Sequence, residues 1–91
     1  MKVDRRIAQT SLKEALETLT RHEDFSTEDA IKAPLLNIAE KLQYKNGQVL
    51  WPIRVALTNE PYSPGVFELI LVIGKEKTLK KISDALHALS F

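Results

Sequence analysis

The sequence predicts an all-α protein, a compact bundle of about five helices in a single domain over residues 1–91. Apolar residues recur at helical spacing along most of the chain, and no run alternates as a half-buried strand would. Hydroxyl and acidic residues at possible helix starts, together with Gly and Pro at possible ends, divide this pattern into pieces of helix length. A chain of 91 residues can bury one modest hydrophobic core.

The first two helices are expected over residues 3–22 and 27–43. The first has an apolar face that includes Leu12, Leu16 and Leu19. Ser26 and Thr27 open the second, because a hydroxyl caps free backbone N–H groups and acids in the first turn suit the positive helix end. Pro34 lies inside the second pattern and predicts a kink or an early break. Gly47 is expected to end this helix in a left-handed conformation.

The remaining helices are expected over residues 48–58, 64–73 and 75–89. Pro52 lies inside the third, so that helix either begins near Trp51 or bends there. The fourth begins with Ser63 and Pro64, a hydroxyl cap followed by proline at the first helical position. It is apolar nearly all round and is expected to be buried. The predicted core contains Leu16, Leu19, Ile31, Leu35, Ile38, Leu42, Ile53, Leu57, Phe67, Ile70, Leu71, Leu79, Ile82 and Leu86.

Composition excludes several classes of protein. The chain has no Cys, which removes disulfides, zinc fingers and thiol nucleophiles together. The adjacent residues His22, Glu23 and Asp24 are too close in sequence to converge on one metal ion. The longest apolar run, residues 69–73, is far too short to cross a membrane. No apolar region follows Met1 as in a signal peptide, so we expect a cytoplasmic location and no membrane partner.

Residues 51–76 hold three motifs in order: Pro-Ile-Arg-Val-Ala-Leu-Thr at 52–58, Ser-Pro-Gly-Val-Phe-Glu at 63–68 and Gly-Lys-Glu at 74–76. Together they resemble the C-terminal anticodon-binding domain of bacterial and organellar glutamyl-tRNA synthetases. Asn59 stands where that family usually has Gly, a mild change because Asn is the next best residue for a left-handed position. The resemblance implies an α-helical, cage-like C-terminal subdomain that recognises the anticodon loop of tRNA.

The resemblance also implies the binding residues. In that family the arginine at the position of Arg54 contacts the first two anticodon bases, and the segment matching residues 63–67 contacts the same two. The implied RNA-binding residues are therefore Arg54, Ser63, Pro64, Gly65, Val66 and Phe67, with Lys75 and Lys77 as candidate phosphate contacts. We expect Arg54 to be at least partly exposed and to lie close to the backbone of residues 63–66. Such residues suit single-stranded RNA, because a guanidinium can stack on bases and donate to their edges, and a helix start offers free N–H groups.

Structural explanations for the same residues stay open. Arg54 could instead pair with Glu60 or Glu68, and Phe67 could belong to the core as much as to a binding surface. The lysines of the last helix could form a solvated face. The net charge of only +1 is low for a nucleic-acid-binding protein, and it favours the alternative function, a stand-alone helical protein-interaction module without RNA binding.

Catalysis is not expected from this chain alone. The resembled enzymes carry nucleotide-binding signatures similar to His-Ile-Gly-His and Lys-Met-Ser-Lys-Ser, and neither occurs here. The resemblance thus implies a non-catalytic part of an ATP-dependent glutamate–tRNA ligase, whose ATP and Mg belong to the rest of the enzyme. We expect no cofactor in this chain, glutamate tRNA and the remaining synthetase as partners, and a monomer.

Overall fold

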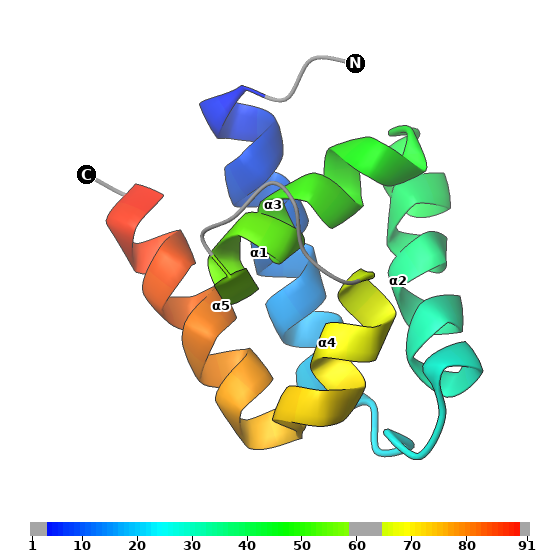
Figure 1. Ribbon diagram of the computed structural model, residues 1–91. Helices are drawn as coiled ribbons and strands as arrows, with labels where there is room; N and C mark the ends of the chain where they lie inside the picture. Colours follow the sequence, from blue (N-terminus) through cyan, green and yellow to red (C-terminus); the bar gives the residue numbers. More distant parts are fainter. Residues whose placement is uncertain (1–3, 59–64, 90–91) are drawn as a thin grey trace.

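A computed structural model describes residues 4–58 and 65–89, which form five α-helices and no strand (Figure 1). In chain order the helices are α1 (Arg5–Arg21), α2 (Glu28–Leu42), α3 (Asn46–Thr58), α4 (Val66–Ile73) and α5 (Lys75–Leu89). The predicted all-α class and the number of helices are confirmed. The predicted bounds of the last helix are confirmed as well, while the others shift by one or two residues.

The first two helices begin at side-chain caps. The Asp4 carboxylate accepts the backbone N–H of Ile7 at 2.8 Å, and the Thr27 hydroxyl accepts that of Ala30 at 3.1 Å. Each bond satisfies one of the N–H groups that a helix start leaves without a partner. The predicted hydroxyl cap of the second helix is therefore confirmed, with Thr27 as the capping residue.

The connection between α2 and α3 differs from the prediction. Gln43, rather than Gly47, takes the left-handed conformation that ends α2, with φ of 59°. Gly47 instead lies in the first turn of α3, which begins two residues earlier than expected. Glutamine can occupy this position because its backbone N–H still donates to the carbonyls of Ala39 and Glu40, which closes the last turn.

Neither internal proline ends its helix. α2 continues through Pro34, and α3 runs through Pro52 rather than beginning near Trp51. Each proline removes one helical hydrogen bond. Helix stability in a folded domain comes mostly from packing of the apolar face, and buried residues lie on both sides of each proline. The loss of one bond therefore does not break the helix.

α1 lies at the centre of the bundle and contacts α2, α3 and α5, whereas α4 covers the side between α2 and α5 (Figure 1). One core joins all five helices. Its buried apolar residues are Leu12, Ala15, Leu19, Ile31, Leu35, Ile38, Ala39, Val49, Ile53, Leu57, Val66, Ile70 and Ile82. The prediction named eight of these. It placed Leu16, Leu42, Phe67, Leu79 and Leu86 in the core as well, and these five pack against it only partly buried.

α4 corrects the prediction of a wholly buried helix. Leu71, expected in the core, is 36% exposed, and the neighbouring Val72 is 79% exposed. Val66 and Ile70, one turn apart, are the buried residues of this helix. Successive residues are rotated by about 100°, so a helix that packs on one side must turn Leu71 and Val72 away. A bundle of this size has too few elements to cover a helix on all sides.

No helix in the described ranges has both the length and the apolar character needed to cross a membrane.

Candidate RNA-binding surface

Arg54 lies on α3 and is half-buried, so the expected partial exposure of this residue is confirmed. Its Nε atom is buried, and no group in the described part of the chain accepts a hydrogen bond from it. The residues one turn away on α3 are Leu50, Trp51, Leu57 and Thr58, none of which is an acid. Arg54 is only partly buried, so its Nη groups, rather than the buried Nε, are the donors that an acceptor on another molecule can reach.

The structural alternatives for Arg54 can be compared with its surroundings. Within residues 4–58 and 65–89, Arg54 forms no ion pair with Glu68. Glu60 lies outside the described residues. Thr58 donates its hydroxyl to the Arg54 backbone carbonyl at 2.9 Å, which fixes the last turn of α3 and leaves the guanidinium uninvolved.

The second part of the surface is the start of α4. Gly65 is the N-cap residue, is exposed, and makes no side-chain capping bond. The helix therefore begins at Val66, two residues later than predicted. Val66 is 3% exposed and Phe67 is half-buried, so both anchor the helix start to the core. α3 and α4 are in contact. Ser63 and Pro64 lie outside the described residues, and the expected approach of Arg54 to the backbone of 63–66 stays a prediction.

A Cβ atom added at Gly65 would meet no atom of the described residues within 4 Å. The backbone of this residue is thus open to approach from outside. Together with the free N–H groups of the first turn of α4, it offers backbone donors to a ligand. A side chain at position 65 would stand in the way of a flat group approaching these donors.

Trp51 is a candidate that the sequence reasoning did not name. It is 38% exposed and lies one helical turn before Arg54 on α3. Exposed aromatic rings are platforms on which unpaired bases stack. The signal was present in the sequence, because residues three apart on a helix share a face, and this is the only Trp of the chain.

The two candidate phosphate contacts at the start of α5 differ. The Lys75 ammonium lies 5.7 Å from the centre of the Phe25 ring, a cation–π contact that ties α5 to the connection between α1 and α2. Lys77 is exposed. The geometry therefore gives Lys75 a structural role and leaves Lys77 better placed to reach a phosphate. Farther along, Lys80 pairs with Asp84 at 3.5 Å on the outer face of α5.

The segment that follows α1 has a packing role. The His22 and Phe25 rings lie 5.5 Å apart. Asp24 accepts bonds from the hydroxyl and the backbone N–H of Ser26, and mainly the hydroxyl bond lowers the pKa of its carboxyl below the ordinary value of 3.8. In the described ranges, no three His, Asp or Glu side chains gather as metal ligands would.

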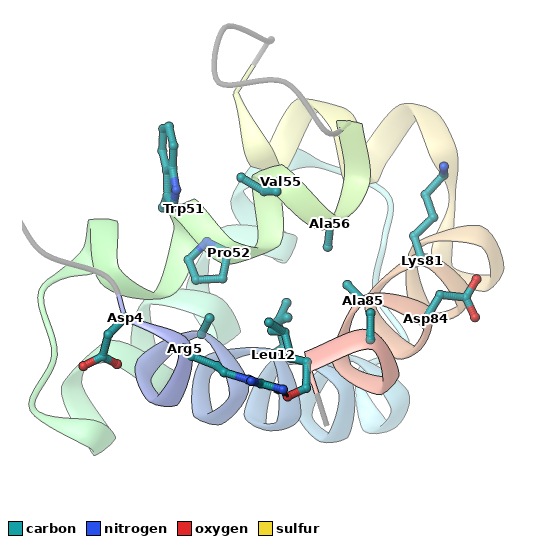
Figure 2. Close-up of a pocket in the computed structure, with 13 residues that line it drawn as sticks. Asp4, Arg5, Leu12, Trp51, Pro52, Val55, Ala56, Lys81, Asp84 and Ala85 are labelled. Carbon is teal, nitrogen blue, oxygen red and sulfur yellow. Dashed lines mark hydrogen bonds between the residues drawn. The ribbon is translucent and has the colours of Figure 1, made fainter. Parts of the chain in front are cut away.

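A groove of about 630 Å³ lies on a different side of α3, between α1 and α5. Pro52 and Ala56 point from α3 toward Leu12 of α1 and Ala85 of α5, while Trp51 points away from the centre of the groove (Figure 2). None of the predicted binding residues that the structure describes lines it. We refer to this feature as the α1–α3–α5 groove.

Comparison with known proteins gives consistent matches. Residues 1–86 match the family described as "Anticodon binding domain". The glutamate–tRNA ligase of Clostridium botulinum (strain Hall) is 42% identical over 83 residues, which cover 87% of this chain and 17% of that protein. The ligase of Clostridium acetobutylicum is 36% identical over 90 residues, covering 98% of this chain and 18% of that protein. These matches fall in the C-terminal region of the relatives.

The fold has a close counterpart among solved structures. The crystal structure of a glutamate tRNA ligase from Elizabethkingia meningosepticum, in complex with its amino acid, superposes with a TM-score of 0.79 at 27% identity. The match covers 97% of this chain and 19% of that one. The chain therefore spans less than a fifth of the length of each of these three proteins.

Proposed function

Because this chain belongs to the anticodon-binding domain family and is homologous to the C-terminal part of glutamate–tRNA ligases, we propose that it recognises the anticodon loop of glutamate tRNA within such a ligase. It reads the first two anticodon bases. The observation that carries the proposal is Arg54, a half-buried arginine whose Nε has no acceptor among the described residues, on the helix whose motif resembles that of the synthetases.

Arg54 acts as the principal base-reading side chain. Its guanidinium presents donors in a flat fork and a plane that stacks on bases. Burial holds the stem of the side chain in place, so little conformational freedom remains to be lost when a base arrives. The buried Nε has no acceptor among the described residues, and the base contact is made by the Nη groups at the end of the side chain. Such a contact breaks no hydrogen bond among the described residues, so it adds to affinity.

The segment of residues 63–67 forms the other half of the site. Ser63, Pro64 and Gly65 bring backbone groups to the bases, and the open space at Gly65 permits close approach. Val66 and Phe67 are fixed in or against the core and hold this helix start in position. Trp51 offers an additional stacking surface, and Lys77 reaches a phosphate.

The net charge of +1 is compatible with this function, since a few contacts to splayed bases carry the specificity. Ligation itself, with its ATP and Mg, takes place in the rest of the ligase. A stand-alone interaction module is the competing function, and it requires no contact of RNA with Arg54 or Gly65.

The test is a titration of the isotopically labelled chain with an anticodon stem-loop of glutamate tRNA, followed by amide NMR shifts. The control is the same stem-loop with the first two anticodon bases exchanged for others. We expect shifts centred on Arg54 and Gly65, and an affinity lower by about 1–3 kcal/mol per changed base. If shifts are lacking at these amides, or if both stem-loops bind equally well, the chain does not read the anticodon.

A further inference from the structure

The α1–α3–α5 groove is apolar at its floor and charged at its rim. Leu12 and Pro52 form buried parts of the floor, and four alanines widen it, namely Ala8, Ala56, Ala85 and Ala88. Because all four residues are alanine, their side chains fill little of the groove, and large side chains from another surface can enter it. A volume of about 630 Å³ leaves room for several such side chains.

The charges at the rim do not favour RNA. Among the described residues of the rim, Asp4 and Asp84 stand against Arg5 and Lys81, which gives two charges of each sign. Arg5 is already engaged, because its Nε and Nη2 donate to the Leu89 carbonyl at 2.9 and 2.7 Å. A polyanion gains nothing from such a balanced rim, whereas a protein surface with mixed charges can be complementary to it.

The position of the groove indicates where its partner comes from. Asp4 caps α1 and Arg5 is its first residue, and both line the groove. In a ligase built like the relatives, more than four-fifths of the protein lies outside the matched part, and that part is C-terminal. The preceding chain therefore reaches this domain beside the groove.

We propose that the α1–α3–α5 groove is the surface on which the preceding part of the glutamate–tRNA ligase docks, through an apolar face with charged edges. This rests on the proposed function, since it places the domain within such a ligase. Docking holds the domain at a fixed orientation, so that a tRNA bound through its anticodon loop is also presented to the rest of the enzyme.

Docking and RNA binding use different sides of α3. Each residue advances a helix by about 100°, so Arg54 lies roughly 200° from Pro52 and from Ala56, which face the groove. A partner seated in the groove therefore leaves Arg54 accessible. Trp51, at the edge of the groove, lies between the two surfaces.

The test uses thiol labelling, because the chain contains no Cys of its own. Ala88→Cys places a thiol in the groove, and Ala33→Cys places one on α2 as a matched control, since both alanines are exposed. Maleimide labelling of each position is followed by peptide mass spectrometry. It is measured in the free chain and in a chimera in which this chain replaces the matching region of the Clostridium botulinum ligase.

We expect labelling at position 88 to be slowed at least about tenfold in the chimera relative to the free chain, because docking covers this thiol. Labelling at position 33 should be unchanged, because that thiol stays exposed in both proteins. Equal rates at position 88 in the two proteins overturn the proposal. A chimera on the Elizabethkingia ligase repeats the comparison should the first fail to fold.

Other occupants give distinguishable results, and each overturns the proposal. A second copy of the chain protects position 88 in the free protein at high concentration, and RNA protects it when the anticodon stem-loop is added. Failure of the proposed function appears separately. If Arg54→Ala does not change stem-loop binding while position 88 is still protected in the chimera, the groove docks the ligase but the domain does not read the anticodon through Arg54.

Discussion

Replacing Arg54 by Ala separates folding from RNA binding more sharply than any other single change in this chain. The side chain is half-buried, and its buried Nε has no acceptor among the described residues. Truncation therefore breaks no hydrogen bond within the described domain. It removes a buried donor without a partner, whose burial costs about 1–3 kcal/mol, and it also removes partly buried methylene groups worth at most about 0.8 kcal/mol each.

These two effects on stability oppose each other, and we expect the free energy of unfolding to change by less than about 1 kcal/mol. For the free energy of RNA binding, no second effect offsets the loss of the side chain. Loss of one base contact costs about 1–3 kcal/mol, which raises Kd for the anticodon stem-loop by about 5- to 150-fold. Arg54→Lys should bind within about 1 kcal/mol of the Ala variant, because an ammonium retains the charge but lacks the fork and the stacking plane.

Urea unfolding followed by Trp51 fluorescence measures the stability of the three proteins, and fluorescence anisotropy with a labelled stem-loop measures Kd. The salt dependence of Kd adds a second test. Replacement of a phosphate contact reduces the slope of log Kd against log salt by about one and weakens all sequences alike, whereas loss of a base contact relaxes the preference for the correct anticodon. An Ala variant that unfolds, or that binds as tightly as the parent, contradicts the role assigned to Arg54.

Three further changes test the fold. Gly74→Ala should destabilise the domain by about 1–3 kcal/mol in urea unfolding, because φ of 91° with ψ of 162° suits only glycine; Gly65→Ala, at φ of −54°, is the matched control and should lose less than about 0.5 kcal/mol. Arg5→Ala removes two bonds to the Leu89 carbonyl and should cost about 1 kcal/mol, with faster amide exchange confined to the ends of α1 and α5. The pKa of Asp24 is lowered in the folded state, so the stability that its carboxylate contributes is complete above about pH 4 and is lost as pH falls through the pKa of the folded state. The stability difference between the parent and Asp24→Asn should therefore shrink below about pH 4.

The helical class and some of the helix ends were predictable because local chemistry determines them. Thr27 caps α2 and Gly74 ends α4, and both roles could be read from residue type and place. The end of α2 could not be read in this way. Gly47 is the better left-handed residue in isolation, yet Gln43 adopts that conformation. The point at which α2 must turn is fixed by its packing within the bundle, which overrides a local preference of about 1 kcal/mol.

The core was predictable in its centre and less so at its edge. Residues such as Ile53 and Ile70 lie on stripes that face one common direction, so helical periodicity identifies them. Phe67 and Leu71 lie beside such a stripe, and their burial depends on whether a neighbouring helix reaches them. Phe67 is only half-buried, so truncating it should cost less than the 3–5 kcal/mol of a fully buried phenylalanine.

The candidate binding surface was identified from two signals in the sequence. One is a position on α3 that helical periodicity does not assign to the core, and the other is the motif that resembles the synthetases. Arg54 was predictable as partly exposed because Ile53 and Leu57 occupy the inward side of α3 and no acid lies one turn away. The groove was not predictable, because alanines give little signal in a sequence and become a surface feature only when three helices bring them together. The same helix α3 thus faces three directions, with Ile53 in the core, Arg54 on the proposed RNA-binding side and Ala56 toward the groove. A substitution at any one of these positions should therefore disturb one property and spare the other two, which is the basis for testing stability, RNA binding and docking separately.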